Sequence, residues 1–123
     1  MLKLLGNIIW ILLGGIEIAI CYFVGGLLLC LTILGIPFGI QLFKLGAMAM
    51  WPFGSVVVAA PATGGCTTIF FNILWFLVGG IWLAVTHFVL GILYCITLIG
   101  VPFGKQHFKL ASLALSPFGK GIL

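Results

Sequence analysis

Residues 35–54 read GIPFGIQLFKLGAMAMWPFG, and residues 100–119 read GVPFGKQHFKLASLALSPFG. Aligning the chain with itself at a shift of 65 residues pairs 6–54 with 71–119, and 26 of these 49 pairs are identical. A shared bias in composition does not produce agreement of this extent. The chain is therefore a tandem duplication, with repeat one at 1–54, a short linker at 55–70 and repeat two at 71–123.

The composition indicates which solvent surrounds both copies. Of the 123 residues, 64% are hydrophobic and 5% are charged, whereas soluble domains carry about 25% charged residues. The mean hydropathy is +1.47. Six charged side chains cannot cover the surface of a water-soluble fold of this size. We therefore predict an all-α integral membrane protein, in which 1–123 form a single membrane domain.

Each repeat opens with a long apolar stretch, 7–36 in the first and 72–101 in the second. A helix needs about 20 residues to span a bilayer, so each stretch is too long for one straight crossing. The Gly-Gly pairs at 14–15 and 79–80 supply a place to bend, because glycine adopts backbone angles that other residues avoid. For repeat one this predicts a short helix at about 3–13, a bend, and a full helix at about 16–35.

Small residues follow a helical spacing along each long helix. Positions 15, 19, 26 and 30 fall within about 60° of one another at 100° per residue. Such stripes let helix backbones approach closely in lipid, so we expect them to pack the two repeats together or one protomer on another. The predicted packing residues are Gly15, Ala19, Gly26 and Cys30, with Gly80, Ala84, Gly91 and Cys95.

Proline, with glycine beside it, is expected to end the long helix at 37–39 and at 102–104. The next Pro-Phe-Gly triplet follows fifteen residues later in each repeat, which leaves room for a helix of about 12 residues, near 18 Å long. That is shorter than the ~30 Å hydrocarbon core, so we predict a short amphipathic helix lying in the membrane interface. Its polar residues in repeat two are Lys105, Lys109, Ser112 and Ser116, and in repeat one Gln41 and Lys44.

All five lysines fall just outside the apolar stretches. Basic flanks face the cytoplasm, and the lysines share one side if each stretch crosses and returns as a hairpin near its Gly-Gly pair. The alternative is a single crossing per repeat. We expect Lys44, Lys105, Lys109 and Lys120 to contact anionic lipid headgroups. The N-terminal segment resembles a secretion signal, but the same motif recurs at 72, so we expect it to be retained.

A few polar residues within the apolar stretches could line a pathway. The candidates are Glu17, Tyr22, Thr32, His87 and Thr97. Glu17 is the only acidic residue, and it is either exposed near the interface or paired in a pore. His87 is either a hydrogen-bonded structural histidine or a proton or ion relay.

The sequence offers no chemistry of an enzyme. It has one acidic residue, no arginine and no phosphate-binding loop, so we expect no catalytic residues and no cofactor. Cysteines 21, 30, 66 and 95 lack the spacing of metal ligands, and no metal is expected. The net charge of +4 is better explained by anionic lipids than by nucleic acid, which we do not expect as a partner.

The elements N-x-x-W-x-x-x-G-G and G-[IV]-P-F-G, followed by F-K-L and P-F-G, occur in both copies. In this combination the chain resembles the YccF-type inner-membrane component domain family, in two tandem copies. The resemblance covers nearly the whole chain and implies a small duplicated inner-membrane protein. It implies no substrate or reaction. Members of this family commonly have a longer polar linker between the two copies, whereas 55–70 is short and apolar here. A function that resides in that linker therefore does not carry over to this chain.

These observations lead to two hypotheses. The first is a non-enzymatic integral membrane protein, a homo-oligomer that self-associates through its small-residue faces and encloses a narrow pathway for an ion or small solute. The alternative is an accessory subunit or membrane scaffold that binds lipids or a partner membrane protein through its basic interfacial helices.

Overall fold

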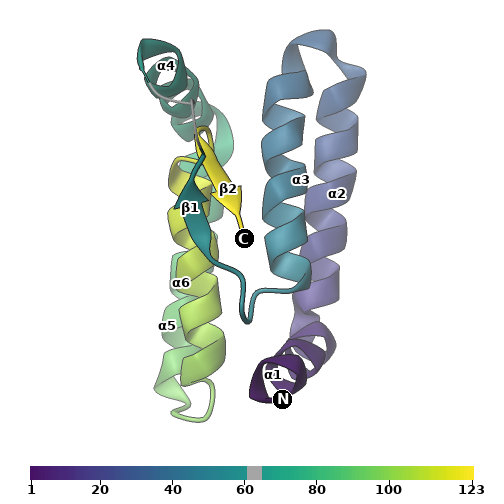
Figure 1. Cartoon of the computed structure of the whole chain (residues 1–123), viewed down its shortest axis with the longest axis vertical. Helices are drawn as coiled ribbons and strands as arrows, with labels where there is room; N and C mark the ends of the chain where they lie inside the picture. The colour runs from purple at the N-terminus through teal and green to yellow at the C-terminus, as the bar shows by residue number, and fades with distance from the viewer. Residues whose placement is uncertain (61–64) are drawn as a thin grey trace. The chain divides into compact units, whose positions relative to one another are not determined.

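The computed structural model describes residues 1–60 and 65–123 (Figure 1). The chain divides into two compact units, Met1–Val56 and Val57–Gly121. The first unit contains repeat one and the second contains repeat two. The proline and glycine of the linker at 61 and 64 argue from the sequence against a spanning segment there, and both lie outside the described residues.

Repeat one begins with a bent helix, as predicted. Helix α1 (Leu2–Trp10) runs through a π-helical turn at Ile11–Gly15 into α2 (Ile16–Leu31). Gly14 lies in the bend with φ 117°, a left-handed conformation that glycine tolerates and other residues rarely adopt. Figure 1 shows α1 turned away from the axis of α2. The Gly-Gly pair thus bends the helix. The chain does not turn back there, so the predicted hairpin near this pair is wrong.

The chain reverses direction at the next turn. Helix α2 ends at Leu31, a 3-10 turn covers Ile33–Gly35, and α3 (Ile36–Met50) returns alongside α2 (Figure 1). Pro37 therefore opens α3 and does not end the long helix. Proline suits the first turn of a helix because the N–H groups there have no partner within the helix. Thr32 closes the turn, with its Oγ1 donating to the Leu29 carbonyl at 2.8 Å.

This hairpin corrects the predicted position of the third helix. An interfacial helix would lie across a spanning helix, whereas α3 runs beside α2 and is 15 residues long instead of about 12. The predicted length was too short because the proline was counted as a stop. Helix α3 lies along α2 because Gly26 and Gly39 let the two backbones approach closely.

The second unit repeats this plan. Helix α4 (Cys66–Trp75) passes through a π-helical turn at Phe76–Gly80 into α5 (Ile81–Ile96), and α6 (Val101–Leu115) returns beside it. Short strands β1 (Val57–Ala59) and β2 (Lys120–Ile122) pair in a two-stranded sheet. Pro102 again lies in the first turn of α6, so the position of the third helix is corrected in the same way.

Three continuous helical stretches within the described residues are long and apolar enough to cross a membrane. They are Leu2–Leu31, Ile33–Met50 and Cys66–Ile96. Large apolar side chains such as Leu27, Leu28, Leu93 and Ile96 are exposed on these helices, which water would disfavour and hydrocarbon does not. The structure thus confirms an all-α integral membrane fold built from two copies of one unit.

Candidate functional site

The asparagine of the repeated N-x-x-W motif holds the end of the third helix. Asn7 Nδ2 donates to the Phe53 carbonyl at 2.9 Å, and the Phe53 N–H donates to Asn7 Oδ1 at 2.8 Å. Asn72 makes the same pair of bonds with Phe118, at 3.1 and 3.0 Å. Asn7 is fully buried. In both repeats this two-bond contact, the asparagine clasp, satisfies backbone groups just after the third helix.

The tryptophan of the same motif contacts the last turn of that helix. Trp10 Nε1 donates to the Ala49 carbonyl at 2.6 Å, and Trp75 Nε1 donates to the Ala114 carbonyl at 2.6 Å. The last carbonyls of a helix have no partner within it, and the last turns of α3 and α6 carry no basic side chain. The indole N–H therefore caps the helix.

The second glycine of the Gly-Gly pair makes room for the indole. A Cβ on Gly15 would overlap Trp10 Cδ1 and Nε1, and a Cβ on Gly80 would overlap the same atoms of Trp75. The N-x-x-W-x-x-x-G-G motif thus encodes a clasp, a cap and the space for the cap. The sequence showed the motif but not its partners, which lie 39 to 46 residues further along the chain.

The predicted small-residue stripes lie inside the hairpins. A Cβ on Gly26 would come within 2.9 Å of the Gly39 carbonyl oxygen, and one on Gly39 would come within 2.6 Å of Cys30 Sγ. In repeat two a Cβ on Gly104 would come within 2.5 Å of Cys95 Sγ. The stripe of α2 thus packs on α3, and that of α5 packs on α6. Ala19 and Ala84 are buried on the same faces.

The candidate pathway residues are spread along the two units. In α2, Glu17 is exposed near the start, Tyr22 is buried and Thr32 closes the turn after the helix. Thr97 has the same role as Thr32 in repeat two, where its Oγ1 donates to the Tyr94 carbonyl at 2.7 Å. Within one repeat these side chains do not share a surface.

His87 lies beside a second buried histidine. Its Nδ1 lies 3.1 Å from Nδ1 of His107, and both side chains are buried, at 4% and 2% exposure. The ring of Tyr94 stacks on His107 at 5.2 Å between centroids. From the sequence, His107 is expected on the surface helix in contact with lipid headgroups, but its side chain is buried. His87 and His107 replace Tyr22 and Leu42 of repeat one. No third His, Cys or acidic residue of the described chain joins them in a metal-binding arrangement.

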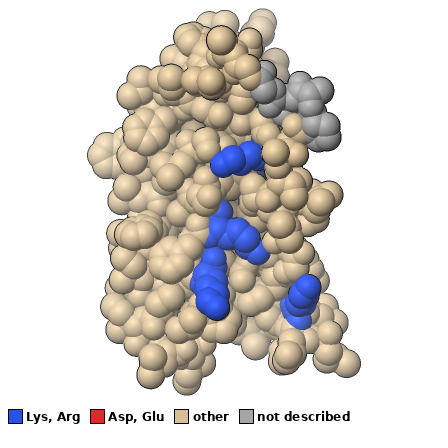
Figure 2. Space-filling view, turned by 60° about the vertical axis from the view of Figure 1, so that its left-hand side comes forward, with Lys and Arg blue, Asp and Glu red and all other residues tan. Residues whose placement is uncertain are grey.

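The polar residues of α6 form one face of the second unit. Lys105, Lys109, Ser112 and Ser116, the basic stripe, fall within about 60° of one another on the helix. Lys120 extends it, because its Nζ donates to Ser116 Oγ at 2.8 Å. Figure 2 shows lysine side chains on a surface with no acidic side chain in view. In repeat one, Lys44 instead donates to Gln41 Oε1 at 2.6 Å.

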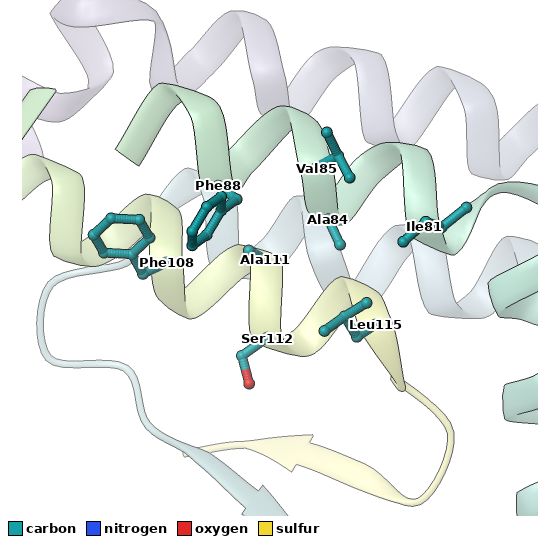
Figure 3. Close-up of a pocket in the computed structure, with 8 residues that line it drawn as sticks. All are labelled: Ile81, Ala84, Val85, Phe88, Phe108, Ala111, Ser112 and Leu115. Atoms are coloured by element: carbon teal, nitrogen blue, oxygen red, sulfur yellow. The ribbon is translucent and has the colours of Figure 1, made fainter. Parts of the chain in front are cut away.

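An apolar groove runs between α5 and α6 directly beside this stripe (Figure 3). Its volume is about 450 Å³. Figure 3 shows Ala84 and Ala111 close together between the helices, with Phe88 and Phe108 at one end and Ile81 and Leu115 at the other. The remaining lining residues are Val85 and Ser112. Ser112 belongs to both the groove and the basic stripe, so charge and apolar surface meet along one line of α6.

The fold and these surfaces define a class: a helical integral membrane protein built from two bent-hairpin repeats. The chain belongs to the inner membrane component domain (YccF) family, which matches it twice, over residues 5–55 and 70–120. The two matches coincide with the two helical repeats, which confirms the resemblance noted in the sequence.

Two curated relatives show the same relationship over nearly the whole chain. The chain is 29% identical to the inner membrane protein YccF of Escherichia coli (strain K12) over 128 residues, which covers 95% of this chain and 84% of the relative. The values for the protein of the same name from Shigella flexneri are identical. No solved structure matches the chain significantly.

Proposed function

We propose that this chain is a non-enzymatic membrane scaffold or accessory component that binds anionic lipids through the basic stripe of repeat two. The observation that carries the proposal is the stripe itself: three lysines, Lys105, Lys109 and Lys120, lie along α6 and the segment after it. No acidic residue occurs between 57 and 123 to neutralise them. A long lysine stem can follow apolar surface while its charge reaches headgroup depth.

The expected strength of this interaction is measurable. A lysine near an anionic membrane surface contributes about 1 kcal/mol, which is about fivefold in affinity. Retention of phosphatidylglycerol over phosphatidylethanolamine by the purified protein, followed by native mass spectrometry, reports this preference. Lys109→Gln is expected to lower the preference about fivefold.

The matched control removes the same charge elsewhere. Lys3→Gln changes a lysine of α1, outside the basic stripe, and is expected to leave the preference nearly unchanged. If both variants lower the lipid preference equally, the preference reflects the net charge of the protein and not the basic stripe. A wild-type protein that retains both lipids equally would contradict the proposal.

A second candidate is self-association around a pathway for an ion or small solute. The observation that favours it is the buried pair His87–His107 with Tyr94, because polar groups inside a membrane protein often mark ion or proton routes. Since the small-residue stripes pack inside the hairpins, contacts between copies would use other faces. Proton flux into proteoliposomes that is abolished by His107→Leu would support this candidate, and the absence of flux for any common ion would defeat it.

A further inference from the structure

We propose that the apolar groove of the second unit binds one acyl chain of an anionic phospholipid whose headgroup lies on the basic stripe. This inference rests on the proposed lipid binding and adds to it the location of the lipid tail. Its occupant follows from three observations: the shape and lining of the groove, its position beside the lysines, and its difference from repeat one.

The groove suits an apolar chain. Seven of its eight lining residues are apolar, and the eighth is Ser112. Its volume of about 450 Å³ falls within the 300–1,000 Å³ of small-molecule sites. Figure 3 shows the Ser112 hydroxyl pointing away from the lining residues of α5, so little polar surface would be desolvated by a hydrocarbon chain. In a membrane protein, an open apolar groove is filled by hydrocarbon.

The helix geometry places positive charge along one edge of this groove. On α6, Phe108 and Leu115 line the groove and lie about 40° and 60° around the helix from Ser112. Ser112 is itself a member of the basic stripe. Lys105 lies one turn before Phe108, and Lys120 contacts Ser116 just beyond Leu115. An anionic headgroup can therefore reach a lysine from either end while its tail lies in the groove.

Repeat one shows why the groove is open in repeat two. Gly46 corresponds to Ala111, and a Cβ on Gly46 would lie 2.8 Å from Cε1 of Phe23. The Phe23 ring thus occupies the space that the Ala111 methyl fills in repeat two. Phe88, the counterpart of Phe23, lies 5.6 Å from Phe108 between ring centroids, and the equivalent pair Phe23–Phe43 lies at 6.3 Å. The Ala111 methyl takes up room at this position, and both Ala111 and Phe88 line the groove.

The test uses a phosphatidylglycerol that carries a photoreactive diazirine in the middle of one acyl chain. The full-length protein is illuminated in nanodiscs that contain this lipid, and the labelled residues are mapped by peptide mass spectrometry. We expect labelling concentrated on 81–88 and 108–115. Val85→Trp fills the groove and should lower this labelling at least fivefold.

Val89→Trp is the matched control. Val85 and Val89 are similarly exposed, at 46% and 48%, and lie one turn apart on α5, but only Val85 lines the groove. Val89→Trp should therefore leave the labelling unchanged. Labelling spread evenly over the exposed helix faces, or unchanged by Val85→Trp, would overturn the inference.

The outcome is separable from that of the headgroup measurement. If phosphatidylglycerol is preferred but the groove is not labelled, the lipid binding stands and the acyl-chain site is wrong. If the groove is labelled equally by a diazirine-bearing phosphatidylethanolamine, the groove holds a chain of any lipid and its coupling to the basic stripe is wrong.

Discussion

The indole nitrogen of Trp10 donates a 2.6 Å hydrogen bond to the carbonyl of Ala49, 39 residues further along the chain. Trp75 and Ala114 have the same relationship in repeat two. In each case the first helix of a repeat caps the last turn of the third. The bend between the first and second helices is what brings the tryptophan to this helix end.

The cap can be tested by removing only the indole N–H. Trp10→Phe leaves an aromatic ring but no donor for the Ala49 carbonyl. The free energy of unfolding, measured by denaturant titration in detergent micelles, should fall by about 1 to 2 kcal/mol. Trp75→Phe should behave alike. Trp51→Phe, at an exposed tryptophan, is the control and should have little effect, and a similar loss in all three variants would contradict the role of the cap.

The asparagine clasp should contribute more than the cap. Asn7→Leu keeps the approximate volume but leaves both the N–H and the carbonyl of Phe53 without this partner. Two partly buried polar groups that lose their bonds cost about 2 to 4 kcal/mol together. Hydrogen exchange of the Phe53 amide should also accelerate. If the amide of Phe53 stays protected in this variant, the clasp is not what holds the segment after α3.

Much of this arrangement could be predicted from the sequence. The duplication follows from the identical pairs, and the membrane class follows from the scarcity of charge. The bend followed from Gly14 and Gly15, because a stretch of that length cannot cross a bilayer once and straight. These three features are local or compositional, and none of them depends on which residues meet in space.

The partners of the motif residues could not be predicted in this way. Asn7 and Phe53 are 46 residues apart, and nothing in the spacing of either marks the other. Pro37 misled the prediction because proline is compatible both with the end of one helix and with the first turn of the next. The deciding fact was that a short turn after Leu31 brings α3 back along α2. His107 was expected to contact lipid headgroups because its burial depends on His87, which the same turn in repeat two brings beside it.

Neighbouring glycines provide a test of the space around the cap. Gly80→Ala places a Cβ in overlap with the Trp75 indole and within 3.0 Å of the Ala114 carbonyl. We expect a loss of about 1 to 3 kcal/mol in the free energy of unfolding. Gly79→Ala meets nothing within 4 Å and should be neutral or stabilising by up to about 1 kcal/mol, because alanine favours a helix. The opposite order would show that the indole does not lie against Gly80.

The hairpin contact can be tested with a second glycine pair. A Cβ on Gly26 would meet the backbone oxygen of Gly39 at 2.9 Å, which only a separation of α2 from α3 can relieve. A Cβ on Gly25 meets only the end of the Leu42 side chain, at 3.3 Å. Gly26→Ala should therefore destabilise the protein by about 1 to 3 kcal/mol, and Gly25→Ala should not. The distance between spin labels on α2 and α3 should increase in the first variant alone.

The histidine pair of repeat two can be tested against the residues that repeat one carries at the equivalent positions. His87 and His107 stand where repeat one has Tyr22 and Leu42. Removing one partner of a buried hydrogen bond costs more than replacing both. The two repeats therefore offer two solutions to the same position in the hairpin, and exchanging only half of one solution should be unfavourable.

A double-mutant cycle in repeat two measures this coupling. His107→Leu alone takes away the group that lies 3.1 Å from His87 Nδ1 and should lower the free energy of unfolding by about 1 to 3 kcal/mol. His87→Tyr alone should also be unfavourable, because a larger side chain then faces His107. The double variant His87→Tyr/His107→Leu recreates the side chains of repeat one and should recover most of the loss, giving an interaction energy above about 0.5 kcal/mol. Costs that simply add would mean that the two imidazoles contribute independently, and the pair would then have no joint role in holding α5 against α6.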